Sequence, residues 1–237
     1  LLGQQCKRHC VWRCQVFEYI CKRRLIVTDF PNTRQLHNMS VKELPRLCEE
    51  IRQKLINDVT QSGGHLASNL GAVELSVALH FVFGENDKIV WDVGHQCYTH
   101  KLLTGRTDLT TLRSRGGLSG FPDAEESDSD NFTVGHAGTA ISQALGLAKA
   151  RDIGGQNYNV VAVVGDGSLT SGLTYEALNN VSGTRMIIVV NDNNMSISQS
   201  VGTSTLNLSK LRVGKYDKNK QKLKGFLTKV PLVGKPM

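Results

Sequence analysis

Two short apolar segments, each followed at once by polar residues, constrain the fold of this chain more than any other feature. The runs NVVAVV at 159–164 and MIIVV at 186–190 are rich in β-branched residues. Such runs are typical of strands that are buried on both faces of a parallel sheet. The segment from Leu173 to Val181 can form the helix that joins them. We therefore predict an α/β fold, with a parallel sheet sandwiched by helices.

The polar residues after these strands indicate a ligand site. Gly165-Asp166-Gly167-Ser168 follows the first strand, and Asn191-Asp192-Asn193 follows the second. Ligands of open α/β sheets bind beyond the carboxyl ends of the strands. The glycines allow close approach of a phosphate, while Asp166 and Asn193 offer the oxygen ligands that Mg²⁺ prefers. One such turn alone is more often an ordinary tight turn, but the pair predicts a metal–diphosphate site.

The remaining elements follow from periodicity and turn signals. We expect a helix with apolar residues between Leu44 and Leu55, a second helix from about Leu70 to Phe83, a strand from Lys88 to Trp91 and a helix ending near Ile153. The last helix follows the small residues Gly135–Thr139, and its N-terminus suits anionic groups. The acidic stretch Asp123–Asp130 is expected to be a solvated loop.

Several separated motifs resemble one known family. The paired GDG and NDN segments resemble the thiamine diphosphate signature of transketolase-like enzymes. The motifs that narrow the match are SGGHLAS at 62–68, WDVGHQ at 91–96, HKLLTGR at 100–106, GGLSGFP at 116–122 and NDNNMSIS at 191–198. Together they resemble the 1-deoxy-D-xylulose-5-phosphate synthase family, from about Val41 to the C-terminus.

The resemblance implies a set of metal and diphosphate ligands. Asp166, Asn193 and the backbone carbonyl of Met195 would bind Mg²⁺. Gly167 and Ser168 would donate backbone N–H groups to the diphosphate of the cofactor, and Asn193 would contact the cofactor as well as the metal.

Three histidines beside glycines gain roles from the same resemblance, whereas a lone histidine is more often structural. His95 and the segment Gly135, His136 and Ala137 would contact the cofactor. His65 would lie near the reacting carbon and assist proton transfer. We therefore assign catalytic roles to His65 and His95.

His100 and Lys101 are interpreted as structural residues. Cys48 is expected in the core, on the apolar face of its helix. The family commonly has serines where this chain has Ala137 and Gly138. The interval from Asp166 to Asn193 is about two residues shorter than is usual there, and a shorter surface loop is normally tolerated.

The family reaction condenses pyruvate with D-glyceraldehyde 3-phosphate, with loss of CO₂, on the path to isoprenoid precursors and thiamine. The resemblance implies thiamine diphosphate and Mg²⁺ as cofactors and a homodimer for the full-length enzyme. The chain corresponds to roughly the first third of the family enzyme, and the activating Glu belongs to the second domain. We expect a diphosphate-binding domain that is inactive alone. Two alternatives stay open: the N-terminal subunit of a split transketolase-type enzyme, and a non-catalytic cofactor-binding protein.

Charge and composition limit the other classes of function. The net charge of +7 comes from the ends, because residues 1–25 carry six Lys and Arg against one Glu, and residues 206–237 carry nine against one Asp. Basic residues without interleaved aromatics disfavour nucleic-acid binding. Four cysteines in the first 21 residues match no zinc spacing. We expect no membrane span and a cytoplasmic protein, or a plastid one in a plant or alga.

The chain is divided into three parts. Residues 1–24 are expected to form an atypical basic, cysteine-rich extension, 25–205 the thiamine diphosphate- and Mg²⁺-binding α/β domain, and 206–237 a basic C-terminal segment that is the start of a truncated family region.

Overall fold

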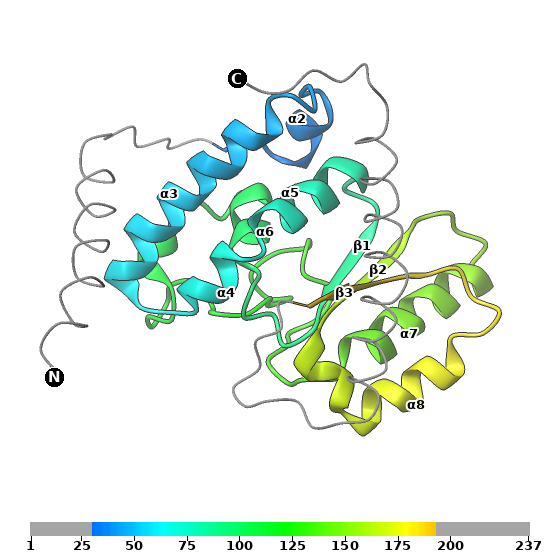
Figure 1. Ribbon diagram of the computed structural model, residues 1–237. Coiled ribbons are helices and arrows are strands. Elements are labelled where there is room, and N and C mark those ends of the chain that lie inside the picture. The colour runs from blue at the N-terminus through cyan, green and yellow to red at the C-terminus, as the bar shows by residue number, and fades with distance from the viewer. Residues whose placement is uncertain (1–29, 193–237) are drawn as a thin grey trace, which may run out of the picture.

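A parallel three-stranded sheet with helices on both faces forms the centre of the molecule (Figure 1). The computed structural model describes residues 30–192. The strands are β1 (Lys88–Trp91), β2 (Val160–Gly165) and β3 (Ile187–Asn191), in the spatial order β1–β2–β3. The helices are α2 (Thr33–His37), α3 (Leu44–Ser62), α4 (Leu66–Leu70), α5 (Val73–Val82), α6 (Tyr98–Leu103), α7 (Ala140–Ile153) and α8 (Gly172–Asn180), with 3₁₀ turns η1 (Leu109–Thr111) and η2 (Asp166–Thr170).

The central strand β2 sets the register of the sheet. Parallel pairing aligns Trp91 of β1 with Val163, and Gly165 at the end of β2 with Asn191 at the end of β3. Side chains alternate across a strand, so neighbouring residues of β2 enter different cores. Val161 and Val163 pack with one cluster of buried side chains, whereas Val160, Ala162 and Val164 pack with the other.

Helices α3, α5 and α6 supply the larger of the two cores. The predicted apolar face of α3 is confirmed, because Leu47, Ile51 and Leu55 are all buried in it. Cys48 is buried beside them, as expected. The helix ends at Ser62, where the following glycine adopts a positive φ of 78°.

Helices α7 and α8 cover the opposite face of the sheet (Figure 1). Ala140, Ala144 and Ala148 recur every four residues on α7 and are fully buried. These small side chains allow the backbone of α7 to lie close to β1 and β2. Helix α8, between β2 and β3, is the predicted connecting helix and packs against α7.

The predicted fold is confirmed, with one boundary wrong. The helix expected from about Leu70 to Phe83 is α5, which begins at Val73, and the short helix α4 that ends at Leu70 was not predicted. Gly71 separates them: its N–H donates to the carbonyl oxygen of Ala67, 3.1 Å away, and closes the last turn of α4. The three strands and α7 lie where the sequence predicts them.

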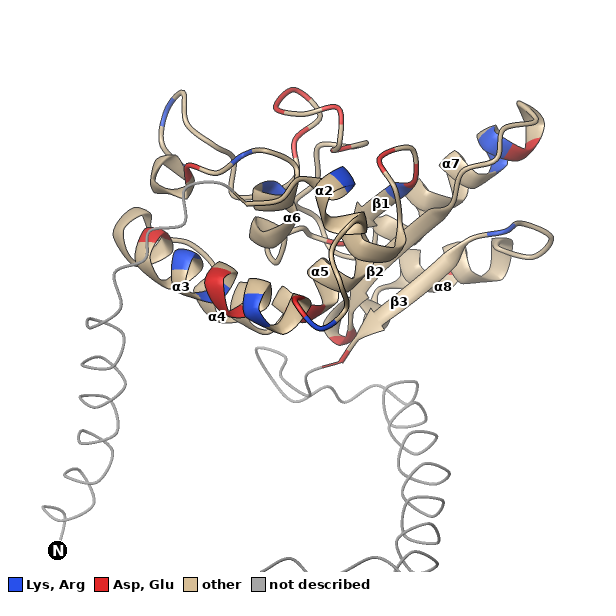
Figure 2. Ribbon diagram, turned by 90° about the horizontal axis from the view of Figure 1, so that it is seen from above, with Lys and Arg blue, Asp and Glu red and all other residues tan. Residues whose placement is uncertain are grey.

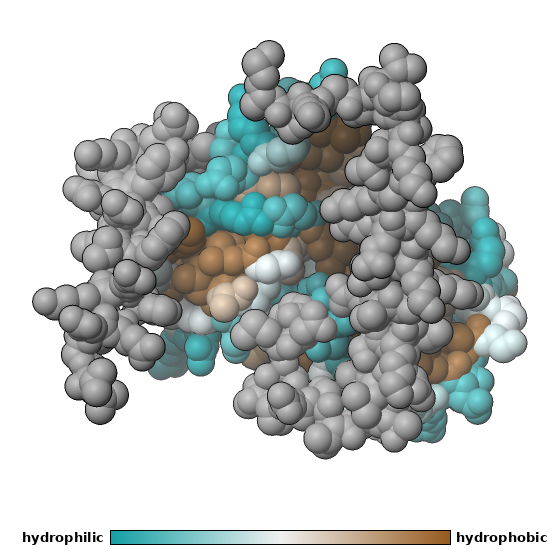
Figure 3. Space-filling model, viewed as in Figure 1, coloured by the Kyte–Doolittle hydropathy of each residue, from teal (hydrophilic) through white to brown (hydrophobic). Residues whose placement is uncertain are grey.

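Apolar side chains remain exposed on β3 and α8. Ile187 and Val190 of β3 are 43% and 44% exposed, although the strand reads as one that is buried on both faces. Figure 3 shows brown, apolar surface in the middle of the view and near the end formed by α8. Among residues 30–192, β3 pairs on one edge only. No helix in this part of the chain is long and apolar enough to cross a membrane.

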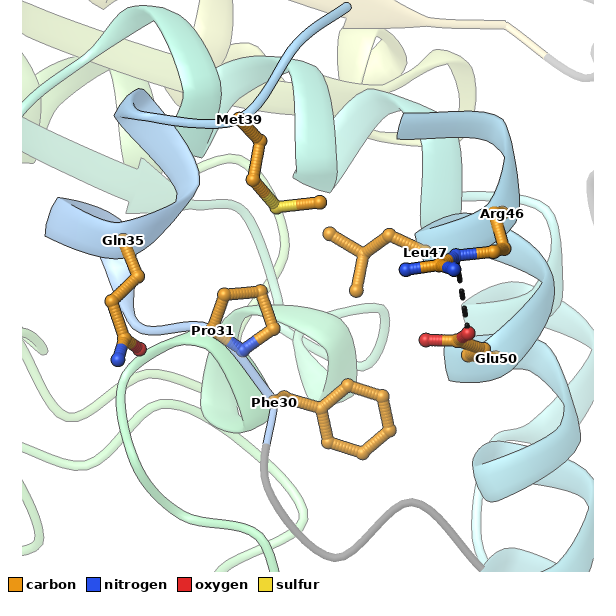
Figure 4. A pocket seen from close by; sticks show the side chains of 7 residues that line it. All are labelled: Phe30, Pro31, Gln35, Met39, Arg46, Leu47 and Glu50. Carbon is orange, nitrogen blue, oxygen red and sulfur yellow. Dashed lines mark ion pairs between the residues drawn. The ribbon is translucent and has the colours of Figure 1, made fainter. Parts of the chain in front are cut away.

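A hollow of about 360 Å³ lies between α2 and α3, away from the sheet (Figure 4). Phe30, Pro31, Met39 and Leu47 point toward one another around it, and Arg46 on its rim is paired with a neighbouring glutamate. It contains none of the predicted site residues. The candidate site must therefore be sought at the strand ends.

Candidate functional site

The first part of the site is the edge where β2 and β3 end. Because Gly165 is aligned with Asn191, the two predicted polar segments leave the sheet side by side. Asp166 begins the 3₁₀ turn η2 directly after β2. Its carboxylate has no hydrogen-bond partner among residues 30–192, and no described residue supplies a counter-ion within ion-pair distance. This carboxylate is therefore available to a ligand.

The turn after Asp166 is fixed from behind by α8. The hydroxyl of Thr174, which is fully buried, donates to the carbonyl oxygen of Ser168 at 2.9 Å. Ser168 is itself buried, while Gly167 is exposed and a Cβ atom there would touch nothing within 4 Å. A held turn with free space in front of Gly167 fits a diphosphate group.

Two of the predicted ligands cannot be compared with the structure. Asn193 and Met195 lie outside the described residues. Within residues 30–192 no group of three or more His, Cys, Asp or Glu side chains could hold a metal ion. The predicted ligand set draws on an amide and a backbone carbonyl as well as one carboxylate, so it stays a prediction.

The second part of the site is a pair of histidine rings. The ring centroids of His65 and His95 are 5.7 Å apart, and the rings meet edge to face at 73°. The ring centroid of Phe121 lies 5.7 Å from that of His65. The motifs at 62–68, 91–96 and 116–122 therefore meet at this point. The Nδ1 atoms of both histidines are buried without a hydrogen-bond partner among the described residues.

Burial lowers the pKa of His95, and the neighbouring His65 lowers it further against the opposing effect of Asp92. The neutral ring of His95 is therefore favoured, and its unpartnered nitrogen can accept or donate one hydrogen bond. Orphaned buried nitrogens on two facing rings fit a polar heterocyclic ligand, because such atoms are costly unless something satisfies them.

Backbone strain positions His95. Val93 adopts a positive φ of 57°, which is unusual for a β-branched residue, and Gly94 follows with a φ of 84°. A Cβ atom on Gly94 would lie 2.2 Å from Cδ of Pro122. Only glycine allows this approach, which holds the Phe121-Pro122 segment against the His95 loop.

Sequence reasoning missed the residues that hold the histidine loops together. Asn69 on α4 is fully buried and hydrogen-bonds to the backbone of both loops. The Tyr98 hydroxyl accepts from the N–H of His65 at 3.3 Å. In the sequence, Asn69 is a polar residue shortly after the Gly64-His65 motif, and nothing distinguishes it from an ordinary turn residue.

The N-terminus of α7 binds an anionic group from the chain itself. Asp92, at the end of β1, accepts hydrogen bonds from the N–H groups of Gly138 and Ala140, both 3.0 Å long. The predicted preference for anions is thus met by Asp92. His136 and Ala137 are exposed in the preceding loop, and Gly135 is partly buried there. The structure brings together His65 and His95, whereas His136 makes no ring contact with either among the described residues.

A chain of buried polar side chains connects the acidic loop with α6, α5 and α2. Asp130 Oδ1 is 2.7 Å from His100 Nε2, and His100 Nδ1 is 2.8 Å from His80 Nε2. The hydroxyl of Thr33 lies 3.3 Å from His80 Nδ1. An ionised Asp130 can only accept, so each neutral imidazole carries its proton on Nε2 and accepts at Nδ1. The structural interpretation of His100 is thereby supported.

The expectation that Asp123–Asp130 is a solvated loop is wrong at two positions. Asp130 is completely buried and receives two hydrogen bonds from Arg106, of 2.5 and 2.9 Å. Glu126 binds Lys101 and Arg106. These paired charges attach the loop to α6; the acidic stretch alone could not reveal partners some 25 residues away. Figure 2 shows the red acidic loop above α6.

Both parts of the site lie beyond the same edge of one parallel sheet. β1 leads within four residues to His95, and β2 leads at once to Asp166. This is where open parallel sheets bind ligands. Fold and site therefore define a parallel α/β domain of the transketolase-like type.

Comparison with known proteins gives the family. The family model for 1-deoxy-D-xylulose-5-phosphate synthase matches residues 27–237. The chain is 52% identical over 207 residues to the 1-deoxy-D-xylulose-5-phosphate synthase of Caldanaerobacter subterraneus subsp. tengcongensis, covering 85% of this chain and 33% of the relative. The synthase of Dictyoglomus turgidum is 54% identical over 192 residues, which are 79% of this chain and 31% of the relative. The chain belongs to the 1-deoxy-D-xylulose-5-phosphate synthase family, and it spans about a third of the length of these relatives.

Proposed function

We propose that this chain is the thiamine diphosphate-binding part of a 1-deoxy-D-xylulose-5-phosphate synthase. The complete enzyme would condense pyruvate with D-glyceraldehyde 3-phosphate and release CO₂. The observation that carries the proposal is the alignment of Gly165 with Asn191, which sets the two polar segments side by side at the edge of the sheet. Family membership supports it.

Mg²⁺ would be held at this edge by Asp166, Asn193 and the carbonyl oxygen of Met195. The carboxylate of Asp166, which has no partner among residues 30–192, supports this, because an unpaired oxygen ligand suits a hard cation. The N–H groups of Gly167 and Ser168 would bind the diphosphate, with Asn193 beside them. The buried hydrogen bond from the Thr174 hydroxyl to the Ser168 carbonyl oxygen supports a turn that is already formed before the ligand binds.

The histidine pair would bind and serve the reactive end of the cofactor. When bound, thiamine diphosphate supplies a nucleophilic carbon and an electron sink. His95 would contact the cofactor with a neutral ring, and His65 would move a proton near the reacting carbon. Gly135, His136 and Ala137 would contact the cofactor from the loop before α7. The Nδ1 atoms of His65 and His95, which have no hydrogen-bond partner in the described part of the chain, support these roles.

Three further features complete the proposal. The full-length enzyme would be a homodimer, and it would work in the cytoplasm, in line with the bacterial origin of the relatives. No nucleic acid would take part. The division into residues 1–24, 25–205 and 206–237 also stays a prediction.

Binding of thiamine diphosphate, measured by titration calorimetry with and without Mg²⁺, tests the proposal. We expect binding that needs Mg²⁺ and that Asp166→Asn weakens by about 10-fold to 100-fold, because a metal ligand loses its charge. Asp128→Asn is the matched control, since Asp128 is exposed in the acidic loop. Binding that ignores both Mg²⁺ and Asp166→Asn would contradict the proposed site.

A further inference from the structure

We propose that Asn69 is a positioning residue: it fixes the separation of the His65 and His95 loops, and cofactor binding depends on it. The inference rests on the proposed function only in its second half, since the geometry of the histidine pair can be measured without any ligand.

The contacts of Asn69 connect three segments of the chain. Its side-chain nitrogen lies 2.8 Å from the carbonyl oxygen of His65 and 2.7 Å from that of His95. Its side-chain oxygen accepts from the N–H of Tyr98 at 2.8 Å. Both amide protons and the oxygen are therefore used, inside a side chain with no solvent exposure.

The two acceptors belong to the histidines themselves. Each hydrogen bond thus fixes the peptide unit from which one ring projects, rather than a distant part of the loop. Because one planar amide donates to both carbonyls, the distance between the two peptide units cannot change without breaking a bond. The separation of the peptide units in turn sets the separation of the two rings, whose centroids are 5.7 Å apart.

A second contact supports His65 from the other side. The hydroxyl of Tyr98 accepts from the N–H of His65, and a Cβ atom on Gly64 would lie only 2.7 Å from this hydroxyl. The Tyr98 N–H is bound by Asn69, so the same amide also orients the residue that supports His65. A side chain that only capped α4 would need a single bond. The triple contact instead suits a ligand site, where small displacements of reacting groups weaken function strongly.

The wild-type chain provides the first measurement. In NMR spectra the side-chain amide protons of Asn69 should exchange slowly with solvent and show couplings across the hydrogen bonds to the His65 and His95 carbonyl carbons. Fast exchange without these couplings would overturn the proposal without any variant.

The second measurement uses Asn69→Ala and Asn69→Asp. Asp keeps the acceptor for Tyr98 but loses both donated bonds and faces two carbonyl oxygens; the wild-type measurement above tests the proposal even where a variant does not fold. Asn57→Ala, at an exposed position of α3, is the control. We expect both Asn69 variants to lose the nuclear Overhauser contact between the His65 and His95 rings and to bind thiamine diphosphate with Mg²⁺ about 10-fold to 100-fold more weakly. Asn57→Ala should change neither.

The outcomes separate the inference from the proposed function. A folded Asn69 variant that keeps the ring contact and wild-type ring shifts would overturn the positioning role. If the wild-type chain binds no thiamine diphosphate while the variants still lose the ring contact, the proposed function fails and the geometric role of Asn69 stands. If the ring contact is lost but binding is unchanged, the dependence of cofactor binding on Asn69 is overturned.

Discussion

Asp130 and Asp166 are aspartates of one domain in opposite situations. Asp130 is fully buried and bound by Arg106 and His100, whereas Asp166 is partly exposed at the end of β2 and has no partner among residues 30–192. Asp130 shows how a paired carboxylate attaches a loop to the fold, whereas Asp166 shows a carboxylate that no described residue pairs and that a ligand can bind. A carboxylate without partners at a ligand-binding edge is thus better evidence for a site than a densely bonded one.

The largest effect is expected from removing the charge of Asp130. Asp130→Asn leaves the buried guanidinium of Arg106 without its main partner and disturbs the bond to His100, so unfolding free energy should fall by about 3–5 kcal/mol. Urea unfolding measures it. Asp128→Asn, in the exposed part of the same loop, should stay within about 0.5 kcal/mol of wild type. If the two variants had equal unfolding free energies, the distinction between paired and exposed carboxylates would be refuted.

Acidification should weaken the same region. Burial lowers the pKa of His80 well below its usual value, with help from His100 and Arg106, and burial also lowers the pKa of His100. Below about pH 6.5 these two histidines become protonated in the unfolded chain but stay neutral in the folded protein. Stability is therefore fully present above that pH and is lost as the pH falls, by up to about 1.4 kcal/mol per pH unit for each histidine.

Asp130 extends this loss to lower pH. Burial opposes its ionisation, but hydrogen bonds from His100 and Arg106 outweigh burial and hold its pKa well below the usual range. Its contribution is present above about pH 4 and disappears as the pH falls toward the folded pKa. Urea unfolding at several pH values measures both steps. His80→Gln should have a shallower slope between about pH 6.5 and pH 5; an unchanged slope would show that His80 is not the group that titrates.

The two aspartates also show what the sequence could predict. The position of Asp166 at the end of a strand could be predicted because a strand signal, a glycine turn and a second strand signal are all local, and the parallel register then aligns the two strand ends. The role of Asp130 was missed because its partners, His100 and Arg106, come from α6 and the turn after it, and charge density alone suggested solvent. Asn69 was missed for a similar reason: two of its three partners, His95 and Tyr98, lie more than 25 residues further along the chain, so burial and hydrogen bonding, not residue type, define its role.

The smallest effect on stability is expected where the effect on binding is largest. Asp166→Asn breaks no hydrogen bond or ion pair among residues 30–192, so its unfolding free energy without ligand should stay within about 0.5 kcal/mol of wild type. In the presence of Mg²⁺ and thiamine diphosphate, wild type should gain stability by mass action, by about 2.7 kcal/mol at 100 times the dissociation constant, and Asp166→Asn should gain much less. Thermal unfolding with and without both ligands measures the difference. A variant that is already unstable without ligand would place Asp166 with Asp130, among the groups that hold the fold, and would remove the main physical argument for a metal site at the end of β2.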